Sequence, residues 1–115
     1  MQENPKLSEH PALLSGFIAY ADQAVVSKQL IKRKAGTVSL FAFDKGQSLS
    51  EHTAPFEAFV EIVDGVAEIV INHRSHTVRA GEFILLPAGV PHAVNALERF
   101  KMVITMIKEE VNSNP

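Results

Sequence analysis

The sequence contains no cysteine among its 115 residues. This absence excludes disulfides, thiolate metal sites and thiol nucleophiles, so any metal ion has to be held by histidine, carboxylate or water. An excess of charge is lacking as well, because 11 basic residues stand against 13 acidic residues and the formal net charge is −2. A protein whose main partner is a nucleic acid carries a basic footprint, so the charge balance argues against DNA or RNA as a partner.

Long apolar runs are also missing. No stretch approaches the roughly 20 apolar residues that span a bilayer, and residues 1–6 lack the basic start and apolar run of a secretory signal. We therefore expect a soluble, cytoplasmic protein with no membrane partner. The length suits one domain, and the polar residues 109–115 are expected to form a flexible tail.

The sequence patterns divide the chain into an N-terminal helical segment and arm at 1–24, a β-barrel at 25–108 and the tail at 109–115. Ser8 is a plausible N-cap for a short amphipathic helix that ends near Ala21. From Val25 onward, short β-branched and aromatic runs alternate with glycine and proline, which predicts strands near 25–34, 37–43, 56–63, 66–71, 76–79, 83–86, 92–94 and 100–107.

The dipeptide Asp64-Gly65 stands between two of these runs and predicts a two-residue hairpin. A second turn is expected to start at Asn72. Many short strands at nearly regular spacing indicate an all-β sandwich or barrel.

Two histidine-bearing segments framed by glycine lie about 35 residues apart, at 46–65 and 81–95. They resemble the two motifs of the RmlC-like cupin superfamily, of the small, single-domain, conserved-barrel type. The first motif is matched at Gly46, His52 and Gly65, whereas alanine stands at its second histidine and its glutamate positions, Ala54 and Ala58. The second motif is matched at Gly81, Pro87, Gly89 and His92, with Asn95 one place early.

The resemblance implies an all-β fold, a double-stranded β-helix or jelly roll, here with a short N-terminal helix. It also implies a homodimer formed through an N-terminal strand. The run from Val25 to Ile31 fits that role, because an unpaired apolar strand otherwise leaves an exposed edge.

The same resemblance implies that His52, Ala54 and Ala58 line the barrel interior from one side and His92 from the other, as ligand-binding positions. We expect the imidazole nitrogens of the two histidines to lie about 3 to 5 Å apart. Two imidazoles bind Zn²⁺, Ni²⁺, Fe²⁺ or Mn²⁺ only weakly without a third ligand. Glu57 is the nearest candidate, although one step along a strand turns a side chain to the opposite face.

Three functions are compatible with these features, and the sequence leaves open whether the protein is an enzyme. The leading hypothesis is a barrel that binds a small organic molecule near His52 and His92. The second is a divalent-metal-dependent enzyme of the dioxygenase, isomerase or decarboxylase type, in which His52 and His92 hold the metal with Glu57 or water. The third is a regulatory or structural barrel that acts through protein partners.

Overall fold

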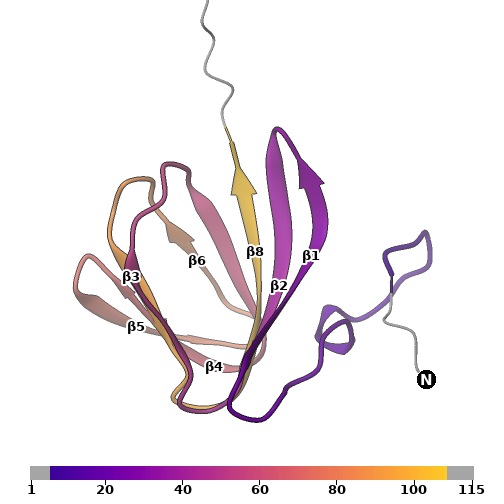
Figure 1. Ribbon diagram of the computed structural model, residues 1–115, viewed down its shortest axis with the longest axis horizontal. Helices are drawn as coiled ribbons and strands as arrows, with labels where there is room; N and C mark the ends of the chain where they lie inside the picture. Colours follow the sequence, from indigo (N-terminus) through magenta and orange to yellow (C-terminus); the bar gives the residue numbers. More distant parts are fainter. Residues whose placement is uncertain (1–5, 109–115) are drawn as a thin grey trace, which may run out of the picture.

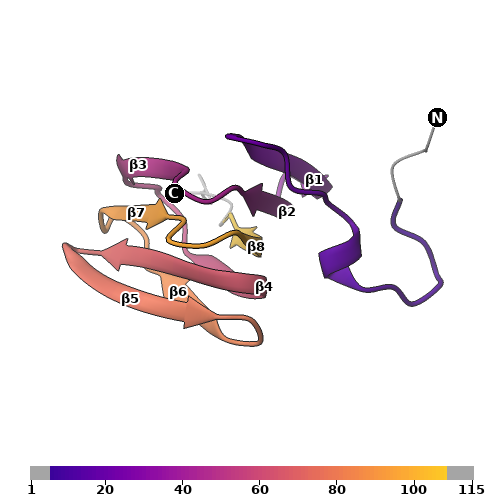
Figure 2. The ribbon, with the colours of Figure 1, turned by 90° about the horizontal axis from the view of Figure 1, so that it is seen from below.

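The computed structural model describes residues 6–108, which contain eight strands and one short 3₁₀ turn. The strands form a single antiparallel sheet that curls into two facing walls (Figures 1 and 2). They are β1 (Val25–Arg33), β2 (Gly36–Phe43), β3 (Ser48–His52), β4 (Ala58–Ile71), β5 (Arg74–Arg79), β6 (Phe83–Leu86), β7 (His92–Asn95) and β8 (Phe100–Ile107).

One wall, which we call sheet A, has the strand order β1-β2-β8-β4-β6, and the other, sheet B, has the order β5-β4-β7-β3. Strand β4 belongs to both walls, because its first half pairs with β8 and β6 and its second half with β7 and β5. All of these pairings are antiparallel. The predicted double-stranded β-helix is confirmed.

The hydrophobic core fills the space between the two walls. Phe43 and Phe100 stack at its centre with ring centroids 4.5 Å apart, and both are completely buried. Residues at alternate positions of β4 face this core, namely Ala58, Val60 and Ile62 in sheet A and Ala67 and Ile69 in sheet B. The period-2 apolar pattern of the strands therefore marks the inner face of the barrel.

Strand β4 corrects the predicted hairpin, because the chain does not turn back at Asp64-Gly65. It continues through them as one 14-residue strand. Gly65 has a φ of 74° and lies beside a register shift between Ile62 and Asp64, so it forms a bulge where β4 passes from one wall to the other. Glycine at positive φ is found in β-bulges as well as in tight turns, so the sequence pattern at Asp64-Gly65 is compatible with both, and the hairpin prediction was wrong.

A two-residue hairpin does occur at Asn72-His73. Both residues have positive φ, 50° and 65°, and Ile71 pairs directly with Arg74. Asparagine tolerates the left-handed conformation better than most residues, so the turn expected at Asn72 is confirmed in a tighter form.

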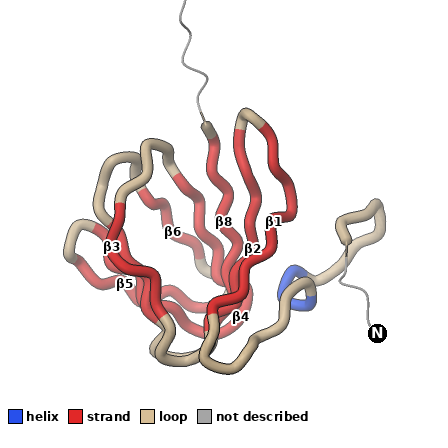
Figure 3. Tube along the Cα trace, viewed as in Figure 1, coloured by secondary structure: helices blue, strands red, loops and turns tan. Residues whose placement is uncertain are grey.

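The predicted N-terminal helix is reduced to a single 3₁₀ turn at Leu14–Gly16, labelled η1 (Figure 3). The Ser8 hydroxyl does accept a 3.1 Å hydrogen bond from the backbone N–H of His10, as an N-cap would, but no helix follows it at residues 9–13. Pro11 and Gly16 leave too short a run between them to nucleate an α-helix.

The segment that contains η1, residues 14–20, packs against the outer face of sheet A. Its apolar side chains cover Leu40, Ala42 and Val103, and they are Leu14, Phe17, Ile18 and Tyr20. The Tyr20 hydroxyl donates a 2.6 Å hydrogen bond to Asp64, and Lys101 Nζ donates one of 2.7 Å to the carbonyl of Ser15. Burial, together with the bond to Asp64, raises the pKa of Tyr20 far above its usual value, so the hydroxyl remains a donor.

Strand β3 was missing from the predicted strands, because Ser48–His52 contains one apolar residue and its partner β7 lies more than 40 residues away in the sequence. The tail predicted at 109–115 lies outside the described residues. Residues 6–108 contain no helix that is long and apolar enough to cross a membrane.

We predict that Gly65→Ala destabilises the fold by more than about 3 kcal/mol, because an added Cβ collides with the Arg99 carbonyl and an L-residue is strained at positive φ. Gly46→Ala is the matched control. Its φ of 87° is equally unfavourable, but nothing lies within 4 Å of the new atom, so we expect a cost of only about 1–2 kcal/mol. Urea unfolding measures both, and equal costs would contradict the close-approach argument.

Candidate functional site

Two histidine rings meet at the inner face of sheet B. His52 ends β3 and pairs directly with His92, which begins β7, and their Nε2 atoms are 3.1 Å apart. The rings meet edge to face, with centroids 4.3 Å apart and an angle of 67° between their planes. His92 is 6% exposed, whereas His52 as a residue is exposed, so His92 forms the floor of the site and His52 its rim.

The backbone determines which nitrogen of each ring carries a proton. His52 Nδ1 lies 2.8 Å from the carbonyl of Ser50, and His92 Nδ1 lies 3.2 Å from the carbonyl of Val90. A carbonyl oxygen only accepts hydrogen bonds, so each Nδ1 is the N–H donor. In the neutral rings, both Nε2 atoms then carry lone pairs, and these lone pairs point at the same region.

This arrangement is unfavourable unless something positive or hydrogen-donating lies between the nitrogens. A proton on one ring, a hydroxyl or amine hydrogen of a ligand, or a metal ion each satisfies both lone pairs. The pair is therefore a recognition point for a donor or a cation.

The surroundings of His92 disfavour the protonated form of its ring. Burial lowers its pKa below the usual value, the carbonyl of Val90 opposes this effect, and the neighbouring His52 adds to the lowering. At neutral pH the His92 ring is consequently neutral, and its Nε2 is available as an acceptor or as a ligand.

The inner faces of the two walls carry apolar side chains that are only partly buried. They pack on the core, and they are Val25, Phe41, Leu49, Ile71, Ile84 and Ile104. Ile71 is the direct β4 neighbour of His92, so the polar pair is flanked by hydrocarbon. A few directed polar groups among apolar side chains are typical of small-molecule sites.

The two motif alanines have different environments. The carbonyl of Ala54 accepts a 2.8 Å hydrogen bond from the backbone N–H of Gly89, which ties the loop after β3 to the loop before β7. Ala58 is 4% exposed and belongs to the hydrophobic core, opposite Leu86 and Met106. Their contact with a ligand stays a prediction.

Glu57 is not brought to the histidines. It precedes Ala58 by one residue and is exposed, and it lines a groove of about 990 Å³ together with Phe59, Leu85 and Thr105. These neighbours lie on the outer face of sheet A, because Phe59 alternates with the inward-facing Ala58 and Val60. Within residues 6–108, no group of three histidine, aspartate or glutamate side chains is placed to hold a metal ion.

The motif asparagine has a structural contact. Asn95 donates a 2.9 Å hydrogen bond to Glu68, whose other oxygen accepts one of 2.7 Å from Ser75. These bonds, that from Ser75 first, lower the pKa of Glu68. The trio links β7, β4 and β5 across sheet B.

Sequence reasoning missed the two carbonyl partners of the histidine rings and the outer groove. Backbone acceptors carry no signal in residue types, and the groove arises from strands that are adjacent only in the folded sheet. The only available clue was that Phe59, Phe83 and Leu85 each alternate with core residues.

Comparison with known proteins agrees with this fold and motif pattern. The model of the Cupin domain family matches residues 39–108. The chain belongs to the cupin family. The search of curated proteins found no match to the sequence.

Several solved structures are similar over four fifths or more of this chain. A conserved protein of unknown function from Streptococcus pyogenes is 32% identical, with a TM-score of 0.85 over 96% of this chain and 98% of that one. A cupin superfamily protein from Desulfitobacterium hafniense is 26% identical, with a TM-score of 0.85 over 93% and 97%. A cupin 2 conserved barrel domain protein from Leptotrichia buccalis is 35% identical, with a TM-score of 0.80 over 82% of this chain and 46% of that one.

The lowered pKa of His92 predicts that this cupin loses stability on acidification. As pH falls through about 6.5, His92 becomes protonated in the unfolded chain but stays neutral in the folded chain. The free energy of unfolding therefore decreases, and it continues to decrease until the pH reaches the folded-state pKa. Urea unfolding from about pH 8 to pH 5 should show a smaller pH dependence in His92→Gln than in the wild type. His10→Gln removes an exposed histidine as the control, and identical slopes in wild type and His92→Gln would refute the prediction.

Proposed function

We propose that this cupin binds a small organic molecule at the inner face of its barrel, anchored by His52 and His92. The observation that carries the proposal is the 3.1 Å approach of two Nε2 atoms whose Nδ1 partners are both committed to backbone carbonyls. Such a pair offers two acceptors to one ligand atom. Ile71, the half-buried β4 neighbour of His92, offers an apolar surface for the rest of the ligand.

The chemistry of the pair selects the ligand class. The ligand needs an O–H or N–H donor at one end, because neutral imidazoles with protonated Nδ1 present acceptors only. It needs an apolar body, because Ile71 lies beside His92 and partly buried apolar side chains of both walls face the barrel interior. A carboxylate without a proton is disfavoured, since its oxygens would face two lone pairs.

Phenol and its methyl ether anisole test this selection, because they share a ring and differ in the donor. We expect phenol to shift the ¹⁵N resonances of the His52 and His92 imidazoles, and anisole to shift them much less. His92→Ala should weaken phenol binding by about tenfold, the loss of one to two hydrogen bonds, while circular dichroism shows an intact fold. Equal binding of the two compounds, or phenol binding unchanged in His92→Ala, would sink the proposal.

A bound divalent metal is the second candidate, and the same geometry favours it. Two imidazole nitrogens on one ion at bonds of about 2.0–2.1 Å are separated by about 2.9–3.4 Å, which includes the observed 3.1 Å. The donor set nevertheless has two protein ligands within residues 6–108, where catalytic sites normally have three. The residues fit a weakly held Zn²⁺, Ni²⁺, Fe²⁺ or Mn²⁺ whose coordination is completed by water or by ligand atoms.

Titration calorimetry with NiCl₂ on tag-free protein tests the metal candidate. We expect weak binding that disappears in a His52→Ala/His92→Ala variant and declines below about pH 6.5, because protonated imidazole cannot bind a metal. Ala54→His restores the missing histidine of the motif and should tighten binding at least about tenfold, the order that supporting groups contribute at metal sites. Ala88→His, at an exposed position, is the control. Affinity undiminished in the double variant would exclude this site.

A further inference from the structure

The inner face of sheet A changes from apolar to polar between β8 and β1. On β6, β4 and β8 the inward side chains are apolar, as in the row of directly opposed residues Ile84, Val60 and Ile104. The next two members of the same row are Ser39 on β2 and Gln29 on β1. Because directly opposed residues of paired strands share a face, these two polar side chains also face the barrel interior.

The neighbouring rows contribute further polar groups. Lys32 lies opposite Thr37, which belongs to the same row as the buried Ala58 of the inner core. On the other side, Ser27 lies opposite Phe41, which packs on that core. We call these inward polar side chains of β1 and β2 the polar wall, which consists of Ser27, Gln29, Lys32, Thr37 and Ser39.

The side chains of the polar wall have no partner within the part of the chain that the structure describes. No hydrogen bond or ion pair joins any of them to another group of residues 6–108. Thr37 and Ser39 are half-buried, and the other three are exposed. Their hydroxyl, amide and ammonium groups are therefore available to a ligand inside the barrel.

The polar wall faces the histidine pair across the barrel. Strands β2 and β3 are consecutive and are joined by a turn at Lys45-Gly46. Ser39 lies six residues before Lys45, and His52 lies six residues after Gly46, so both lie at a similar distance from the turn. Figure 1 shows the two strands on opposite sides of the open cup, with β3 at the left and β2 at the right. Packed sheets are separated by about 10 Å, which sets the least distance that a ligand has to span between the walls.

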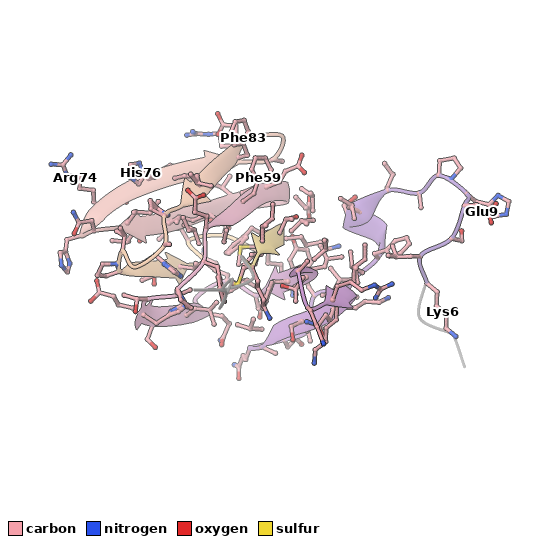
Figure 4. The ribbon with its side chains drawn as sticks, turned by 90° about the horizontal axis from the view of Figure 1, so that it is seen from above. Lys6, Glu9, Phe59, Arg74, His76 and Phe83 are labelled. Carbon is pink, nitrogen blue, oxygen red and sulfur yellow. The ribbon has the colours of Figure 1, made fainter. Side chains whose placement is uncertain are left out.

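The charge on this side of the barrel favours an anion. Strands β1, β2, β7 and β8 contain no aspartate or glutamate, and Lys32 supplies a cation at the polar wall. The one carboxylate of β3, that of Glu51, is paired with His73 at 3.4 Å. Figure 4 shows Arg74 and His76 projecting from β5 at the far edge of sheet B, away from β1 and β2. An ammonium group among hydroxyl and amide donors is suited to a carboxylate.

We propose that the ligand is a two-ended organic acid, with a hydroxyl or amine at His52 and His92 and a carboxylate at the polar wall. This inference rests on the proposed function, because it describes the other end of the same ligand. The two ends of the site select opposite groups. The histidine pair presents only acceptors to its ligand, whereas Lys32, Gln29 and the hydroxyl groups supply donors. Between them, Ile104 offers an apolar contact to the body of the ligand.

A pair of eight-carbon compounds tests the proposal, because 8-hydroxyoctanoate and 1-octanol share the hydroxyl and the chain and differ only in the carboxylate. At about pH 7.5 the acid is ionised. Calorimetric titration of the full chain should show that the acid binds at least about tenfold more tightly than the alcohol, as expected for hydrogen bonds to a charged group.

Variants of the polar wall should reduce this preference for the acid. We expect Lys32→Ala to reduce it about three- to fivefold, the range of an exposed charge pair, and Lys32→Ala/Ser39→Ala to reduce it about tenfold. Arg74→Ala is the matched control, because it removes an exposed cation from the far edge of sheet B, and it should retain the preference of the wild type. Circular dichroism verifies the fold of each variant.

Equal affinities of the wild type for the two compounds, or a full preference for the acid in Lys32→Ala/Ser39→Ala, would overturn this inference. His92→Ala distinguishes that failure from a failure of the proposed function, because both compounds carry the hydroxyl that the histidines bind. If His92→Ala weakens neither compound, the proposed function fails and this inference fails with it. If His92→Ala weakens both compounds but the wild type does not prefer the acid, only the assignment of the polar wall is wrong.

Discussion

The architecture depends on one backbone position in the middle of β4. Gly65 adopts a φ of 74° while the carbonyl of Arg99 lies where a Cβ would stand, and this combination only glycine accommodates. The bulge allows a single strand to pair with β8 in one wall and with β7 in the other. Because β7 carries His92 and pairs with β3, which carries His52, the histidine pair is positioned through the same strand.

The histidine pair shows how backbone atoms decide the chemistry of side chains. Two imidazoles close together usually share one proton without difficulty, since either ring donates to the other. Here each Nδ1–H donates to the backbone carbonyl two residues earlier in the sequence, so neither Nε2 carries a proton in the neutral rings and both need the same donor. With alanine at the positions of two further motif ligands, two imidazoles stand in place of a full metal cage.

Sheet A packs an apolar cluster on its inner face and a second one on part of its outer face. The chain covers part of the outer face, around Leu40 and Val103, with its own N-terminal segment. The groove on that face includes Pro55 and Ala88, and the two loops that contain them are joined by the hydrogen bond from Gly89 to Ala54. Those loops also adjoin His52 and His92, so the surface and the site share structural elements.

Most strands, the fold family and the two histidines were predictable from the sequence, because alternation of apolar residues and fixed motif spacings are local properties. By itself the sequence thus determined the barrel, the absence of thiol chemistry and the loss of two motif ligands at Ala54 and Ala58. The Asp64-Gly65 bulge and the 3₁₀ turn at Leu14–Gly16 were misjudged, since the same residues suit a hairpin or a helix until neighbouring strands are in place. Only the tertiary structure decided the tautomers of His52 and His92, the exclusion of Glu57 from their site and the groove that Phe59 and Leu85 line on the outer face of sheet A. Each of these is a relation between segments that pairing brings together from distant parts of the chain, and no local pattern encodes it.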